Sequence, residues 1–163
     1  MKKKFILAAV VGAAVGAGLH FLYDAVPNVL TALISPVNES VWEHLKLLFF
    51  PMLLTAFWLA RQTPDRYALW SGIFVAELVM PLFLLGGFYL LGCGFGAVSL
   101  PLDLALYAAT MALGYFVAWL VFKSRHLEKA AVWLLIPVIL YGASLILFTF
   151  AAPQFAVFMP PAE

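Results

Sequence analysis

Five apolar stretches, each long enough to cross a lipid bilayer, leave little of this chain for anything else. A membrane-spanning helix needs about 20 mostly apolar residues. Only 10% of the 163 residues are charged and 66% are hydrophobic, so polar side chains are too few to cover the apolar ones in water. We predict an all-α, multi-pass membrane bundle that forms one domain over residues 1–163, with spans near 5–26, 41–60, 67–92, 102–122 and 130–150.

Basic residues predict the orientation of this bundle, because Lys and Arg in short connections are retained on the cytoplasmic side. Eight of the nine basic residues lie before span one, between spans two and three, or between spans four and five. We therefore expect a cytoplasmic N-terminus, an extracytoplasmic C-terminus and a location in the inner (plasma) membrane. The eight are Lys2, Lys3, Lys4, Arg61, Arg66, Lys123, Arg125 and Lys129.

The first apolar stretch has a second interpretation, as a cleaved signal peptide. Basic residues 2–4 precede an apolar run with small residues near Gly16 and Gly18, where cleavage would occur. The run continues through Leu22, which makes it long enough to span and favours a retained helix. Cleavage would leave the other four spans oriented as before.

The segment PVNESVWEHLK, residues 36–46, concentrates polar groups at the start of the second span. Asn38 is the expected N-cap, and Glu39 would then lie in the first turn, where the helix dipole favours an acid. Glu43 and His44 lie deeper, where a helix start alone does not explain them. Lys46 is close enough in sequence to pair with Glu43, and His44 could hydrogen-bond a neighbouring carbonyl.

Ionisable and hydroxyl groups recur in the other spans, although burying a charge in a bilayer costs at least about 2.5 kcal/mol. Gly12, Gly16, His20 and Asp24 recur every four residues, so a continuous helix would place them on one stripe, with the glycines allowing close helix approach. All of these polar groups fall in the middle or extracytoplasmic half of the predicted bundle. The later spans contribute Glu77, Asp103, Tyr107 and Tyr141.

Two histidines with several carboxylates are the side chains of a divalent metal centre, in which an open position can activate water. We therefore expect an extracytoplasmic cluster that binds a divalent metal ion or performs acid–base chemistry, which includes hydrolysis, on a lipid-like or small substrate. The candidate catalytic residues, also the candidate metal ligands, are His20, Asp24, Glu43 and His44. The candidate substrate-binding residues are Lys46, Glu77, Asp103, Tyr107 and Tyr141.

Other chemistry fits the same residues. A carboxylic acid such as Glu43 or Glu77 could exchange protons with an imidazole without metal, and Ser40 lies one helical turn before His44 as a candidate nucleophile. Chains of Asp, Glu and His also line proton or ion pathways, which predicts a component of a coupled transporter. Finally, the cluster could be a closed structural network in a non-catalytic assembly or regulatory protein. The lipid bilayer is the expected partner in every case, and no nucleic acid is.

The stretch SPVNESVWEHLKLLFFPML, with the preceding HFLYD, resembles an uncharacterised family of small bacterial integral membrane proteins. In that family a VNESVWEHLK-like segment opens the second hydrophobic helix. The resemblance implies the same membrane fold and no particular reaction. It also implies importance for the motif residues Asn38, Glu39, Ser40, Trp42, Glu43, His44 and Lys46.

Overall fold

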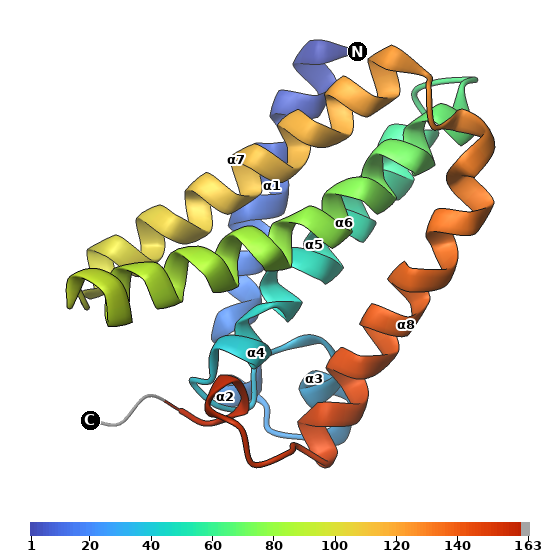
Figure 1. The fold of residues 1–163 in the computed structure, drawn as a ribbon. Coiled ribbons are helices and arrows are strands. Elements are labelled where there is room, and N and C mark those ends of the chain that lie inside the picture. Colours follow the sequence, from blue (N-terminus) through green and yellow to red (C-terminus); the bar gives the residue numbers. More distant parts are fainter. Residues whose placement is uncertain (161–163) are drawn as a thin grey trace.

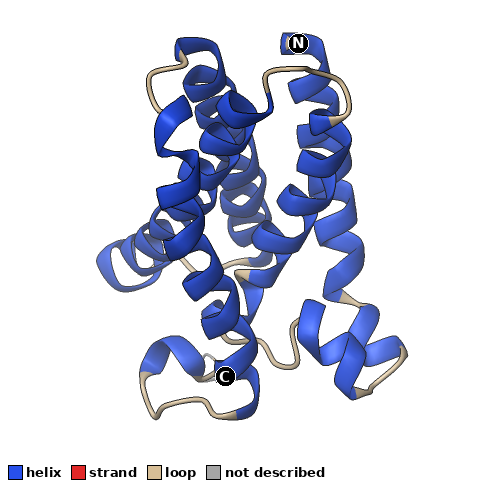
Figure 2. Ribbon diagram, turned by 90° about the vertical axis from the view of Figure 1, so that its right-hand side faces the viewer, coloured by secondary structure: helices blue, strands red, loops and turns tan. Residues whose placement is uncertain are grey.

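The computed structural model describes residues 1–160, and within that range the chain consists of helices and short connections without a strand (Figure 2). Five segments are long and apolar enough to cross a membrane, which agrees in number and order with the predicted spans. The structure is therefore consistent with a membrane protein. The segments are Lys2–His20, Val41–Ala60, Arg66–Gly94, Leu100–Ser124 and Glu128–Phe150.

Two long helices, α6 (Arg66–Tyr89) and α7 (Leu100–Ser124), lie side by side and are joined through the π-helical turn η1 (Leu90–Gly94) (Figure 1). Helix α1 (Lys2–His20) packs on α5 (Lys46–Ala60) and on α7, and α8 (Ala131–Phe150) packs on α6. The core between them is apolar and fully enclosed at residues such as Leu45, Met52, Leu69, Ile73 and Met80.

The first helix is shorter than predicted. We expected one span over residues 5–26, but α1 ends at His20 and two short helices follow, α2 (Leu22–Ala25) and α3 (Val29–Ile34). Asn28 starts α3, because its Oδ1 accepts hydrogen bonds from the amides of Leu30 and Thr31. The expected stripe is therefore interrupted, and Asp24 is exposed on a separate short helix.

The second span covers the predicted residues 41–60, but its N-cap lies two residues later than we expected. Ser40, rather than Asn38, is the N-cap of α4 (Val41–His44), and its Oγ accepts a hydrogen bond of 3.3 Å from the amide of Glu43. Asn38 instead accepts a 2.9 Å bond from the amide of Ser40, which holds the turn before the helix. Asn and Ser are both common N-cap residues, so residue type alone did not distinguish Asn38 from Ser40. The actual start of the helix determines which side chains of the motif face the bundle.

The glycines of α1 permit the close helix approach that their spacing predicts. A Cβ atom on Gly16 would lie 2.5 Å from the carbonyl oxygen of Leu47 and would also meet the hydroxyl of Tyr107. A Cβ atom on Gly12 would meet the hydroxyl of Tyr115. Both glycines are buried, and they bring α1 against α5 and α7.

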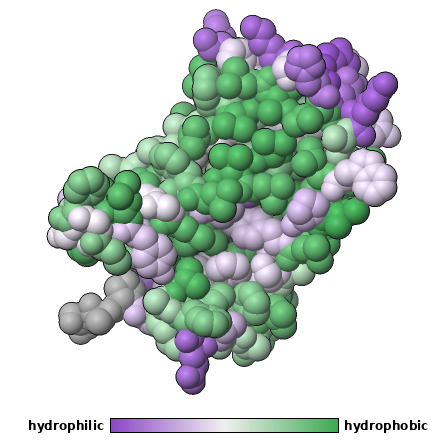
Figure 3. All heavy atoms as spheres, viewed as in Figure 1, coloured by the Kyte–Doolittle hydropathy of each residue, from purple (hydrophilic) through white to green (hydrophobic). Residues whose placement is uncertain are grey.

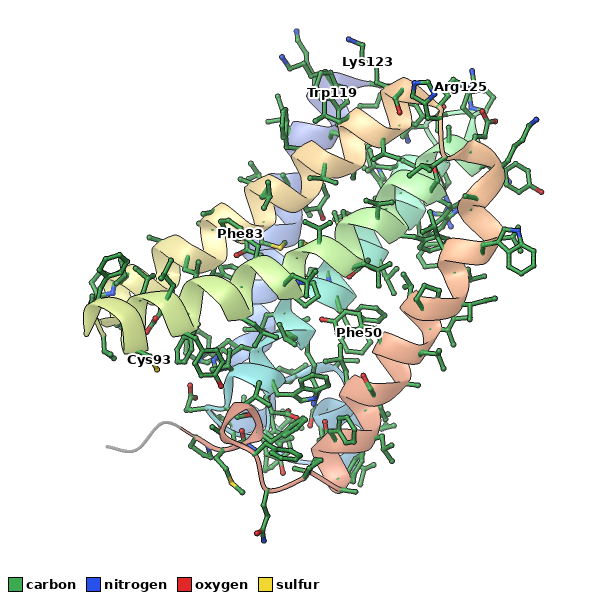
Figure 4. The ribbon with its side chains drawn as sticks, viewed as in Figure 1. Phe50, Phe83, Cys93, Trp119, Lys123 and Arg125 are labelled. Atoms are coloured by element: carbon green, nitrogen blue, oxygen red, sulfur yellow. The ribbon has the colours of Figure 1, made fainter. Side chains whose placement is uncertain are left out.

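With the exception of Lys46, the basic residues gather at one end of the molecule, here called the basic end. Hydrophilic residues cover this end in Figure 3, whereas hydrophobic ones cover the middle, and Lys123 and Arg125 lie there in Figure 4. Arg125 bonds Glu128 and Asp65 at 3.0 Å each, and the two carboxylates raise the pKa of Arg125 above its ordinary value. Helices α2, α3 and α4 lie at the opposite end (Figure 1).

Candidate functional site

The polar motif at residues 36–46 divides into two clusters that face different surroundings. Glu39 and His44 join His20 in a partly exposed group, here called the acid–imidazole cluster. Glu43 and Lys46 turn inward and form a buried ion pair. Neighbouring residues of one short helix therefore serve two separate sites.

The acid–imidazole cluster brings three possible metal ligands together. The Nε2 atom of His44 lies 3.4 Å from Oε2 of Glu39, and Nε2 of His20 lies 3.9 Å from Oε1 of the same carboxylate. The two imidazole rings lie 5.2 Å apart between centroids. One ligand atom from each residue lies within 4.8 Å of the other two.

Three different segments place these side chains. His20 is the last residue of α1, Glu39 precedes α4, and His44 is the last residue of α4. Because Gly16 lets α1 approach the backbone of Leu47, the turn of α1 that follows it lies beside the junction of α4 and α5. The cluster thus depends on close packing of the first two spans.

A hydrogen bond defines how His44 can act. Its Nδ1 atom lies 2.8 Å from the carbonyl oxygen of Ser40, and a carbonyl only accepts, so Nδ1 donates the proton. Neutral His44 then presents the lone pair of Nε2 toward Glu39. Metal-binding histidines usually have this arrangement, in which the second ring nitrogen is fixed by a carbonyl or a carboxylate.

The separations suit a divalent ion after a small adjustment. Ligand bonds of about 2.1 Å in tetrahedral geometry place two ligand atoms about 3.4 Å apart. The 3.4 Å and 3.9 Å distances end on different oxygens of Glu39, and the three atoms that one ion would join lie within 4.8 Å of one another, so their separations must shorten by up to about 1.4 Å (4.8 against 3.4 Å). Rotation of exposed side chains covers such a difference, since Glu39 is 67% exposed.

An apolar pocket of about 290 Å³ lies beside the cluster, and His20, Glu39 and His44 line it. Its wall includes Leu47 of α5, Leu84 and Phe88 of α6, and Leu104 of α7. Asp103 and Tyr107 of α7 are its other polar residues. The pocket therefore combines a polar edge with a hydrophobic interior, as small-molecule sites commonly do.

The buried ion pair is a closed network. Lys46 Nζ donates to Oε2 of Glu43 at 2.7 Å and to the carbonyls of Ala32 and Ser35 at 2.8 and 3.2 Å. Glu43 also accepts from the Val37 amide and the Thr149 hydroxyl, each at 3.0 Å. With both charges paired, this network joins the motif to α3 and α8, as a structural element would.

The other candidate residues lie apart from the acid–imidazole cluster. The Tyr107 hydroxyl lines the pocket but donates to the Ala13 carbonyl at 3.0 Å. Glu77 and Tyr141 are enclosed by the helices, and their side-chain oxygens have no hydrogen-bond partner among residues 1–160. Trp42 packs against Phe148 and Phe158.

Sequence reasoning assigned Glu39 only to the helix start, whereas the structure places it between the two imidazoles. Helical periodicity did not predict this position of Glu39. The residue lies before the first residue of α4, so the preceding turn, and not the helix, orients its side chain. Distance along the sequence does not single out Glu39 either, because Glu43 lies nearer to His44 and Asp24 nearer to His20.

Comparison with known proteins gives a family without a known activity. No curated protein and no solved structure matches the chain. Residues 1–162 match the model described as "Family of unknown function (DUF6512)". Because the match covers almost the whole sequence, the chain belongs to this family of unknown function.

Proposed function

We propose that this protein is a multi-pass inner-membrane protein that binds a divalent cation through His20, Glu39 and His44 and uses it for hydrolytic chemistry on a lipid-like or small substrate. One observation carries the proposal. Three ligand atoms lie within 4.8 Å of one another in the lining of an apolar pocket, and one imidazole is already fixed by the Ser40 carbonyl.

The donor set supports this choice of chemistry. Two imidazoles and one carboxylate are a ligand set of catalytic zinc sites, where three protein ligands leave a position for water or substrate. A divalent ion in such a site lowers the pKa of bound water and polarises a carbonyl or phosphoryl oxygen. The adjacent apolar wall would hold the hydrocarbon part of a substrate.

The basic end supports the proposed orientation. Because Lys and Arg are retained in the cytoplasm, that end would lie inside the cell and the acid–imidazole cluster outside. A substrate would reach the cluster from the extracytoplasmic surface or from the outer part of the bilayer. The C-terminus would then be extracytoplasmic.

Elemental analysis tests the metal assignment. The full chain is purified in detergent after growth with zinc, and the metal is counted against protein for the parent, His44→Ala and Glu39→Ala. We expect about one zinc per chain in the parent and large losses in both variants, because two ligands alone hold zinc weakly.

Two matched controls are available in the chain. His126→Ala removes a histidine at the basic end, and Asp24→Asn removes an exposed carboxylate outside the cluster. Both should retain the metal. A parent protein without stoichiometric metal, or full retention by His44→Ala, would refute the site.

Coupled transport is a second candidate, and Glu77 is the observation that favours it. This carboxyl group lies near the middle of α6, fully buried and without a partner in the described part of the chain. Ionisable groups at such depth commonly serve proton or ion pathways. If transport is the function, Glu77→Gln abolishes proton flux in reconstituted vesicles while the metal content is unchanged.

A further inference from the structure

The charged residues that line the apolar pocket are acidic, and this indicates the charge of the ligand that it selects. Two carboxylates, Glu39 and Asp103, line it, and no Lys or Arg does among the described residues. Anionic head groups would meet repulsion there, whereas a cationic group would find a partner. A divalent ion held by Glu39 would balance the two carboxylates overall, but Asp103 would remain the negative group on its own side of the pocket.

Asp103 is the carboxylate that is free to recognise a ligand. Glu39 lies between the two imidazoles and is a proposed ligand of the metal ion. Asp103 lies in the first turn of α7, exposed, and its side chain has no hydrogen bond or ion pair with any residue between 1 and 160. The neighbouring Tyr107 hydroxyl is directed to the Ala13 carbonyl.

The size and lining of the pocket limit the rest of the ligand. About 290 Å³ is near the lower end of the ~300–1,000 Å³ range of small-molecule sites, which suits one hydrocarbon chain better than two. Leu84, Phe88 and Leu104 supply an apolar surface for that chain. The ionisable pocket residues His20, Glu39, His44 and Asp103 lie at or near helix ends, and Tyr107 lies further inside α7.

We propose that the pocket binds a single-chain amphiphile with an amine or ammonium head group, and that Asp103 is the residue that recognises the head group. The proposal rests on the proposed function for the reaction of such a ligand at the acid–imidazole cluster. Binding itself requires only Asp103 and the apolar wall. Asp103 is thus a specificity residue and takes no part in holding the metal.

Photo-crosslinking tests this selectivity. The full chain in phosphatidylcholine nanodiscs is irradiated with a diazirine-bearing long-chain alkylamine or with the alkyl carboxylate of equal chain length, and labelled peptides are mapped by mass spectrometry. We expect the amine to label the peptides that contain residues 84–88 and 100–107 preferentially. Because Asp103 is exposed and water screens its charge, Asp103→Asn should reduce this labelling about two- to fivefold.

Two further variants make the outcome decisive. Asp103→Glu should restore the preference for the amine, and Asp24→Asn, which removes an exposed carboxylate outside the pocket, should leave it unchanged. Equal labelling by the two probes, or labelling that ignores Asp103→Asn, overturns the proposal. A mere helix-start role for Asp103 would alter stability and leave the amine-to-carboxylate ratio unchanged.

The metal is assayed separately in the same samples, with and without chelator. Asp103→Asn should keep the metal content of the parent. Amine-selective labelling in a protein that holds no metal would support the ligand proposal and reject the metal site. Stoichiometric metal without amine-selective labelling would support the metal site and reject the ligand proposal.

Discussion

The Nζ atom of Lys46 lies 2.7 Å from Oε2 of Glu43, and neither side chain reaches solvent. A charge enclosed in this way is stable only while its partner and its hydrogen bonds remain. The ion pair therefore connects the polar motif to the surrounding helices, and its loss should disturb their packing. Thr149 of α8 donates a hydrogen bond to the same carboxylate.

Breaking this ion pair should destabilise the fold strongly. Glu43→Gln or Lys46→Met leaves one buried charge unpaired, and each should lower the free energy of unfolding by about 3–5 kcal/mol. The double variant should lose clearly less free energy of unfolding than the two single variants lose together, because it leaves no unpaired charge. Unfolding in detergent measures all three. Additive losses would show that the two side chains act independently.

Glu77 should respond in the opposite way. Its carboxyl oxygens are buried without a partner in the described residues, so Glu77→Gln removes no ion pair and eases the burial of an ionisable group. We expect the free energy of unfolding to be unchanged or slightly higher than that of the parent. The comparison with Glu43→Gln, the same chemical change in a paired site, is made under identical conditions. A loss as large as that of Glu43→Gln would reveal a hidden partner.

A side chain at position 16 should disrupt the close packing of α1 against α5. Gly16→Ala places a methyl group 2.5 Å from the Leu47 carbonyl, and such overpacking costs about 1–3 kcal/mol. It should also weaken metal binding, since it displaces His20. Gly18→Ala is the matched control, because nothing lies within 4 Å of its added atom. The same loss from both variants would contradict a packing role specific to Gly16.

Cys93 offers a test of orientation, since it is exposed and is the single cysteine of the chain. It lies in η1, at the far end of the α6 and α7 pair from the basic end (Figure 4). A membrane-impermeant thiol reagent should label Cys93 in intact spheroplasts. In the Cys93→Ser background, Ser124→Cys should need a permeant reagent. The reverse pattern would invert the proposed topology.

Acidification should release the metal from the acid–imidazole cluster. Each imidazole must be neutral to bind an ion, so protons compete with the metal and the affinity falls as the pH is lowered. Zinc transfer to a fluorescent chelator, measured across a pH series, should approach about two protons taken up per ion released. An affinity that does not depend on pH would exclude the two histidines as ligands.

The sequence was sufficient for the number and order of the membrane-length helices, because apolar length is a local property. It was insufficient for the end of α1, since residues 19–26 remain mostly apolar and contain no glycine or proline to mark the break at Phe21. Glu43 and His44 are adjacent, yet one faces the core and the other the pocket. Only the packing of α4 against other helices decides that difference.

The acid–imidazole cluster is built entirely from the first 44 residues, whereas much of the facing pocket wall, including Asp103, comes from α6 and α7. During synthesis the ligand-holding part is therefore complete before the wall that would hold a substrate has been made. Under the proposed function, the same division would separate reactive residues from selective residues along the gene. Substitutions in the α6 and α7 hairpin would then change which molecule is accepted while the three proposed ligands stay as they are.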